Sequence, residues 1–269
     1  MKQFIFFFLC ASVIISVNAQ TIPVFPAKPN NKTPAKKNEI NSKNSTKTFI
    51  LPEMIVVEGG SFNMGSADGA SDEKPIHMVE VKRFSISKYE ITQSQWQAIM
   101  GSNPSEFAGC ITCPVENVSW NDIQDFLKEL HAQTGRHYRL PTESEWEFAA
   151  RGGLRSKGFT YAGSFGVSNV AWHSENSGNQ THPAGQKKPN EIGICDMSGN
   201  VWEWCEDWYL VYGTSQLNQE SSTLGRLRVI RGGSWGGASS DCRIPNRANQ
   251  DPAKRSNDTG FRIVADLYN

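Results

Sequence analysis

The chain has 269 residues and carries 27 basic and 27 acidic side chains. A length in this range allows one large domain or two small ones. Seven lysines and a single glutamate fall within residues 1–48, which leaves 20 basic and 26 acidic residues in the remainder, a net charge of −6. Because binding to phosphates needs a basic face, this balance argues against nucleic acid as a partner.

The first 19 residues have the features of a secretory signal peptide. Lys2 gives a positive start, residues 4–17 are predominantly apolar, and residues 17–19 offer a small-residue cleavage site before Gln20. The alternative is an uncleaved anchor, although the apolar run is short for a membrane span. We therefore expect a secreted or periplasmic protein with no transmembrane span after cleavage.

Residues 20–48 differ in composition from the rest of the chain. They contain six lysines, one glutamate and many Asn, Pro, Ser and Thr residues. Such a segment cannot bury enough apolar surface to order itself. We expect a disordered basic linker here, followed by one domain over residues 49–269.

The first part of this domain shows patterns of strands and helices. Residues 54–57 and 79–89 alternate or run apolar, which predicts strands. Helices are predicted over residues 92–100, 119–133 and 142–151, because each begins with a Ser or Thr that can cap its first turn.

The part that follows residue 151 is richer in loop-forming residues. Glycine, asparagine and serine dominate as far as residue 190, and no further amphipathic helix is visible there. The pattern as a whole predicts an α+β domain with short strands, two or three helices and long packed loops.

Residues 190–208 carry three tryptophans among five acidic residues. Few surface loops can expose so much aromatic area. Trp202 and Trp204 alternate with Glu203, so a short extended segment with one buried face is expected.

A tight turn is predicted just before this segment, at Gly199 and Asn200. The carboxylates of Asp196 and Glu203 bracket the turn. Carboxylates together with free backbone carbonyls suit a hard cation such as calcium. The alternative is a tryptophan-filled core with solvated acids at its rim.

Five cysteines lie beyond the signal peptide, and an exported chain meets an oxidising compartment. Cys110 and Cys113 have the spacing of a zinc half-site, but no second such pair exists, so we expect a small disulfide instead. Cys205 and Cys242 form a second candidate pair. Cys195 is then left as a buried thiol.

Two histidines, His173 and His182, share a loop rich in Asn, Ser and Gly with Glu175. Histidines in such a loop can act as ligands or bases, or they can be satisfied by the loop itself. The sequence alone leaves both interpretations of these histidines open, a functional role and a structural one.

Four segments of the chain resemble the formylglycine-generating-enzyme family, also called sulfatase-modifying-factor domains. They occur in the family's order and cover about residues 50–266. The resemblance implies the fold of that family, which is a variant of the C-type-lectin-like fold. The segments are residues 54–65 (Met-Ile-Val-Val-Glu-Gly-Gly-Ser-Phe-Asn-Met-Gly), 139–147 (Arg-Leu-Pro-Thr-Glu-Ser-Glu-Trp-Glu), 193–204 (Gly-Ile-Cys-Asp-Met-Ser-Gly-Asn-Val-Trp-Glu-Trp), and 231–235 (Arg-Gly-Gly-Ser-Trp) with 260–262 (Gly-Phe-Arg).

Family members that oxidise a substrate cysteine to formylglycine bind copper(I) through two cysteines, since soft thiolates suit this ion. The resemblance places these cysteines three and eight residues after the serine of Gly-Gly-Ser. That serine is Ser234 here, so Ser234 and Cys242 are the candidate catalytic residues, but Gly237 stands where the first copper ligand should be. Copper is therefore not expected, unless Cys195 or Cys205 approaches Cys242 in space.

The resemblance also implies a calcium site in the Trp-rich stretch. Carried over position by position, Asp196 and Glu203 would offer carboxylates, while Gly199 and Val201 would offer backbone carbonyls. Oxygen ligands of this kind suit calcium. We expect calcium as the cofactor of this domain.

The missing cysteine favours a non-catalytic recognition or envelope-assembly module. Its partner would be a protein or peptide, such as a sulfatase or a component of an envelope complex. Two alternatives remain. One is a copper-dependent oxidoreductase that converts a sulfatase cysteine to formylglycine, and the other is a lectin-like binder displayed on a cell.

Overall fold

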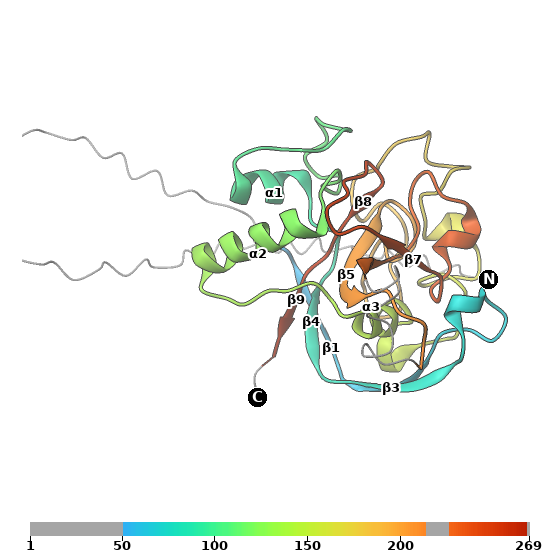
Figure 1. Ribbon diagram of the computed structural model, residues 1–269. Helices are drawn as coiled ribbons and strands as arrows, with labels where there is room; N and C mark the ends of the chain where they lie inside the picture. The colour runs from blue at the N-terminus through green and yellow to red at the C-terminus, as the bar shows by residue number, and fades with distance from the viewer. Residues whose placement is uncertain (1–50, 214–225, 268–269) are drawn as a thin grey trace, which may run out of the picture. The chain divides into compact units, whose positions relative to one another are not determined.

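The computed structural model describes residues 51–213 and 226–267, which form an α+β domain with short strands (Figure 1). Its α-helices are α1 (Gln93–Met100), α2 (Trp120–Thr134) and α3 (Glu143–Ala150). Each begins after a capping box, in which the side chains of the cap and of the third helical residue each accept a hydrogen bond from the other's backbone N–H. The three predicted helices are thus confirmed within a residue or two.

Within residues 51–213 and 226–267, nine short strands form three sheets, with the strand orders β1-β4-β9, β2-β3 and β7-β6-β5-β8. All pairs are antiparallel except the short parallel pair of β5 with β8. The strands are β1 (Met54–Val57), β2 (Gly60–Met64), β3 (His77–Val81), β4 (Phe84–Ser87), β5 (Trp202–Trp208), β6 (Arg228–Arg231), β7 (Arg247–Gln250), β8 (Thr259–Gly260) and β9 (Val264–Asp266).

The strand predicted over residues 79–89 was wrong in one respect. The structure divides it between β3 and β4, which pair in different sheets. The break falls at Lys82 and Arg83, two charged and exposed residues that carry the chain from one sheet to the other.

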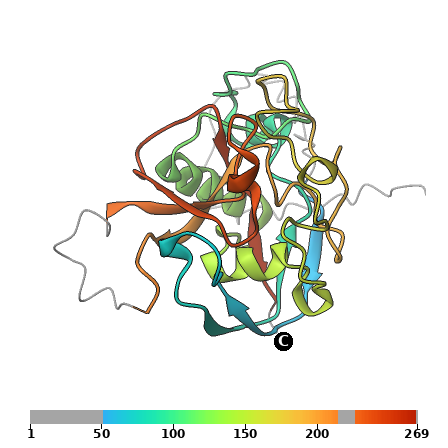
Figure 2. The ribbon, with the colours of Figure 1, turned by 90° about the vertical axis from the view of Figure 1, so that its right-hand side faces the viewer.

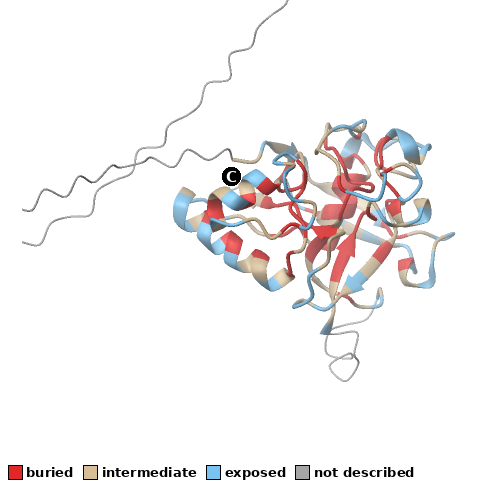
Figure 3. Cartoon of the chain, turned by 90° about the horizontal axis from the view of Figure 1, so that it is seen from above, coloured by how far each residue is buried: buried red, intermediate tan, exposed pale blue. Residues whose placement is uncertain are grey.

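Two clusters of buried side chains form the core. One gathers around Trp146 of α3, and the other lies between helices α1 and α2 and the strand residue Trp204. Figure 3 shows the buried positions concentrated along the strands and on one side of α2. Trp204 and Phe261 are fully buried, whereas Trp202 is half-buried and keeps part of its ring at the surface.

The segment between α3 and β5 contains no α-helix, as the sequence predicted for the part up to residue 190, and it contains no strand either; only short 3₁₀ turns interrupt it. In Figure 2 it is the yellow-green to gold trace at the right of the view. No helix in residues 51–213 and 226–267 has the length and apolar character needed to cross a bilayer.

Candidate functional site

The predicted turn before β5 is present, and its backbone explains its sequence. Asp196, Gly199 and Asn200 all have positive φ, at 56°, 78° and 65°. A Cβ on Gly199 would lie 2.3 Å from the carbonyl oxygen of Trp172, so only glycine fits there. The turn therefore holds the loop at Trp172 tightly against the start of β5.

A buried ion pair closes the turn. Arg262 donates from Nε to Glu203 Oε2 at 2.6 Å and from Nη2 to Glu203 Oε1 at 2.7 Å, and both side chains are fully buried. Trp146 Nε1 also donates to Glu203 Oε2, at 2.7 Å. Such bidentate pairing fixes both geometry and charge. It joins the Gly-Phe-Arg segment to the Trp-rich strand.

Two further carboxylates lie in the same buried region. Glu90 accepts hydrogen bonds from Asn200 Nδ2 at 2.7 Å and from Val201 N at 3.3 Å, and Asp196 accepts from Gly185 N at 2.6 Å. Burial, with the neighbouring carboxylates, raises the pKa of Glu90 well above its usual range, and burial raises the pKa of Asp196 to about 6.

Three buried carboxylates thus share one guanidinium. The negative charge exceeds the positive charge, which favours the protonated form of the carboxyls, but in the described part of the chain these three side chains do not come together as a metal site. The donor set fits calcium in chemical type, because Asp196 and Glu203 supply oxygens and the turn supplies carbonyls. In this structure both oxygens of Glu203 already accept from Arg262, so a calcium ion at the turn would share Glu203 with Arg262.

The Gly-Gly-Ser segment follows β6. Gly232 and Gly233 have φ of 99° and 76°, and a Cβ on Gly233 would lie 2.9 Å from Cys242 Sγ. The glycines therefore allow the backbone to pass directly over Cys242. The Cys242 side chain is completely buried, and burial raises the pKa of its thiol to about 12.

The residues at this position do not fit copper(I). Burial disfavours the thiolate of Cys242, which is the form that binds a metal. Gly237 has no side chain to offer, and its backbone carbonyl accepts from Ser174 N at 3.0 Å. Within residues 51–213 and 226–267, no three His, Cys, Asp or Glu side chains come together as a metal site.

The cysteine predictions divide into two outcomes. The disulfide between Cys110 and Cys113 is confirmed, and Cys195 is a free buried thiol as expected. The proposed bond between Cys205 and Cys242 is wrong, since both are free and buried. Cys205 points into the core on β5 and Cys242 packs under Gly233, so neighbouring motifs do not bring the two sulfurs together.

The loop that carries the two histidines lies against the Gly-Gly-Ser segment. Ser177 Oγ donates to the carbonyl oxygen of Trp235 at 2.8 Å, and His182 Nε2 lies 2.6 Å from the carbonyl oxygen of Ser177. The ring of His182 stacks on Trp172 at 3.8 Å. His173 is fully buried, and neither its ring nitrogens nor Ser234 Oγ has a hydrogen-bond partner among the described residues.

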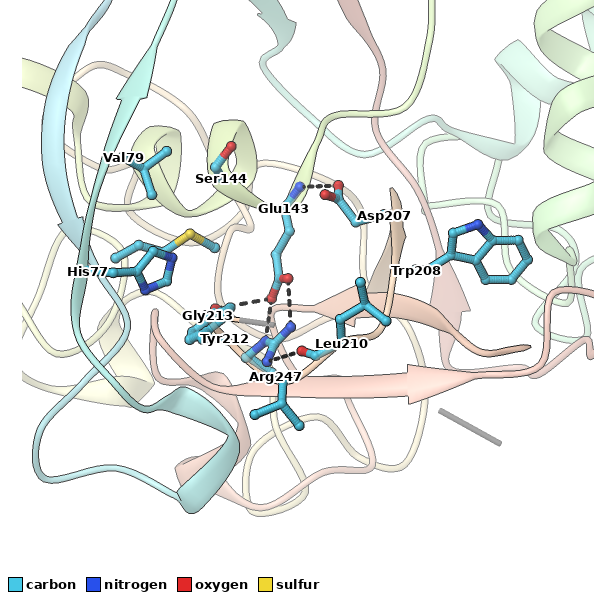
Figure 4. Close-up of a pocket in the computed structure, with 12 residues that line it drawn as sticks. His77, Val79, Glu143, Ser144, Asp207, Trp208, Leu210, Tyr212, Gly213 and Arg247 are labelled. Atoms are coloured by element: carbon cyan, nitrogen blue, oxygen red, sulfur yellow. Dashed lines mark hydrogen bonds and ion pairs between the residues drawn. The ribbon is translucent and has the colours of Figure 1, made fainter. Parts of the chain in front are cut away.

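At least two cavities lined by described residues open on the surface of the domain. One, of about 240 Å³, lies between α3 and β7, and an ion pair between Arg247 and Glu143 lines it (Figure 4). There Arg247 holds Glu143 through two hydrogen bonds of 2.6 and 2.8 Å, and Asp207 accepts from Glu143 N at 2.7 Å. The other, of about 460 Å³, is lined by residues 107–110, Cys113 and residues 180–183.

Comparison with known proteins settles the family. The profile of the sulfatase-modifying factor enzyme 1-like domain matches residues 39–267. The chain belongs to this family. The sulfatase-modifying-factor domain seen here therefore has the formylglycine-generating-enzyme fold that its four motifs indicated.

Three relatives illustrate the range of this family. The chaperone protein LppX of Paenibacillus barcinonensis is 33% identical over 82% of this chain and 91% of its own length. The formylglycine-generating enzyme of Streptomyces coelicolor is 28% identical over 79% of this chain and 88% of its own length. Among solved structures, Treponema denticola variable protein 1 is 30% identical, covers 80% of this chain and 95% of its own, and has a TM-score of 0.71.

The sequence missed several residues of this sulfatase-modifying-factor site. Glu90 and Arg262 lie far from the turn in sequence, and only the Gly-Phe-Arg motif hinted at Arg262. Phe107, whose ring meets that of Trp235 edge-on at 5.2 Å, was also missed. It joins the wall of the larger cavity to the Gly-Gly-Ser segment.

Proposed function

We propose that this sulfatase-modifying-factor domain is an exported, non-catalytic module that recognises a protein or peptide partner, such as a sulfatase or a component of an envelope complex. The proposal rests on the two positions at which copper(I) would need cysteine ligands, Gly237 and Cys242. Gly237 replaces the first cysteine, and the remaining thiol of Cys242 is buried and protonated at neutral pH. Oxygen chemistry at copper(I) has no pair of thiolates to support it.

Two partly exposed tryptophans near Gly237 support the recognition of a partner. Trp235 and Trp202 are half-buried and keep part of their rings accessible. Partly exposed tryptophans next to polar loops are common anchors in protein interfaces. The name of the relative LppX, a chaperone protein, agrees with a role in binding proteins. Export rests on residues 1–19, which lie outside the described residues.

Incubation of the purified protein with a Cys-x-Pro-x-Arg peptide, copper and a reductant tests the proposal. We expect the peptide mass to stay unchanged. An 18-dalton loss at the peptide cysteine, abolished by Cys242→Ser, would instead establish the oxidoreductase alternative. The lectin-like alternative stays a prediction, and a glycan array read with the same protein addresses it.

Calcium is proposed as a stabilising ion of the turn, held by Asp196, Glu203 and the carbonyls of Gly199 and Val201. The excess of buried carboxylates around Arg262 supports the proposal. Its role there would be to neutralise charge and to fix the loop beside β5, with no part in a reaction.

A further inference from the structure

The loops between α3 and β5 carry a charge opposite to that of the rest of the domain. Residues 151–191 contain five basic and two acidic side chains, whereas the other residues of 49–269 contain 15 basic and 24 acidic ones. The segment therefore has a net charge of +3 and the remainder a net charge of −9. Such a separation of charge steers an anionic partner towards the segment and away from the remainder.

Two stretches of this segment lie side by side, within the yellow-green to gold part of the trace in Figure 2. Lys188 N donates to the carbonyl oxygen of Asn169 at 3.1 Å. A Cβ on Gly163 would lie 2.7 Å from the carbonyl oxygen of Pro189, so the two backbones are in close contact there. The loop that contains Gly163 is therefore held next to the loop that contains Lys188.

Three exposed cations belong to these loops. Arg155, Lys157 and Lys188 are exposed to solvent, and none of them forms an ion pair with a described residue. Lys157 N donates to Glu191 Oε1 at 3.0 Å, so this carboxylate lies at the loops and offsets one positive charge. The excess of positive charge is available to a partner, because long basic side chains can extend from the surface to reach anionic groups.

An aromatic pair accompanies the cations. Phe165 is 66% exposed, and its ring meets the half-buried ring of Phe159 edge-on at 4.9 Å. Exposed phenylalanine next to basic side chains is the composition with which peripheral segments enter the headgroup region of an anionic bilayer. A soluble polyanion would bind the cations but would not bury the rings.

We propose that these basic aromatic loops, residues 155–165 and 187–189, dock on the surface of an anionic lipid bilayer. The basic side chains bind the lipid phosphates, and Phe165 enters among the headgroups. The inference goes beyond the recognition of a protein or peptide partner proposed above and does not depend on it.

Sedimentation of the purified protein with lipid vesicles tests the inference. One set of vesicles contains phosphatidylcholine alone, and the other contains phosphatidylcholine mixed with anionic phosphatidylglycerol. We expect binding to the mixed vesicles only, and weaker binding as salt is added. Lys157→Gln combined with Lys188→Gln should weaken this binding about 10- to 30-fold, since two charges are lost. Phe165→Ser should weaken it about 3- to 10-fold, since less apolar surface is buried.

Matched controls are Lys74→Gln combined with Lys82→Gln, and Met78→Ser, because these residues are also exposed but lie outside the loops. All variants keep the basic residues 20–48, so differences between them arise in the domain. The inference is wrong if the wild-type protein binds neither kind of vesicle or binds both equally, or if the loop variants bind as tightly as the controls. Binding that needs the two lysines but not Phe165, and that long-chain polyphosphate abolishes, would assign the loops to a soluble polyanion instead.

Discussion

Two neighbouring regions of this domain have different physical characters. The turn before β5 keeps a dense set of buried charges, in which Arg262 binds both oxygens of Glu203. In the region beside it, Gly233 of the Gly-Gly-Ser segment packs over one buried thiol, Cys242, and there is no second sulfur at position 237. The comparison shows that paired and buried charges characterise the first region, whereas the second region has a single buried thiol and a glycine at position 237.

The largest expected effect concerns the buried ion pair. Arg262→Met leaves the carboxylate of Glu203 buried without its guanidinium, and we expect the free energy of unfolding to fall by about 3–5 kcal/mol. Urea denaturation followed by tryptophan fluorescence measures it. Arg255→Met is the control, because Arg255 pairs with Asp122 at the surface, and a loss below about 1 kcal/mol is expected there. Equal losses in the two variants would contradict a structural role for the turn.

Calcium removal gives the next effect in size. If calcium binds only the folded turn, a concentration 100-fold above its Kd stabilises the domain by about 2.7 kcal/mol. We therefore expect a chelator to lower the Tm by several degrees. Asp196→Asn should abolish the response, and its Oδ1 can still accept from Gly185 N. Asp68→Asn, at an exposed position, should leave it unchanged. If the Tm of the wild-type protein does not depend on calcium, the proposal that calcium binds at the turn is wrong.

A smaller effect distinguishes two carboxylates of the same strand. Unlike Glu203, Asp207 forms no ion pair with a described arginine or lysine, and burial raises its pKa to about 6. A carboxyl whose pKa is higher in the folded than in the unfolded state holds its proton more tightly when folded. Its contribution to stability is therefore present below about pH 4 and is lost as the pH rises through 6.

We expect this loss to amount to about 1–2 kcal/mol, since part of the Asp207 side chain is exposed to solvent. Denaturation of the wild type and of Asp207→Asn between pH 4 and pH 7 measures it, and the variant should have the flatter profile. Asp125→Asn, on the exposed face of α2, should follow the wild type. Identical profiles for wild type and Asp207→Asn would show that this carboxyl titrates normally.

Local signals in the sequence predicted much of the fold. The caps of α1, α2 and α3, the positive-φ turn at Gly199 and Asn200, and the disulfide of Cys110 with Cys113 all depend on residues close together in the chain. The four motifs indicated the family, and the distance from Ser234 in the sequence identified Cys242 as the candidate catalytic cysteine.

Contacts between distant residues could not be predicted in the same way. Glu90 and Arg262 meet at the turn only because β4, β5 and the segment before β9 fold together. Spacing in the sequence also did not show that Cys205, on β5, and Cys242, which packs under Gly233, remain unpaired thiols.

The central claim is that Cys242 is not a metal-binding thiolate. A competition titration with a colorimetric copper(I) chelator, run on the wild-type protein and on Cys242→Ser, measures this directly. Because the thiol is buried with a pKa of about 12 and Gly237 offers no second sulfur, we predict the same weak copper(I) affinity for both proteins. Tight stoichiometric binding by the wild type that is lost in Cys242→Ser would contradict the claim and would restore the oxidoreductase as the function of this domain.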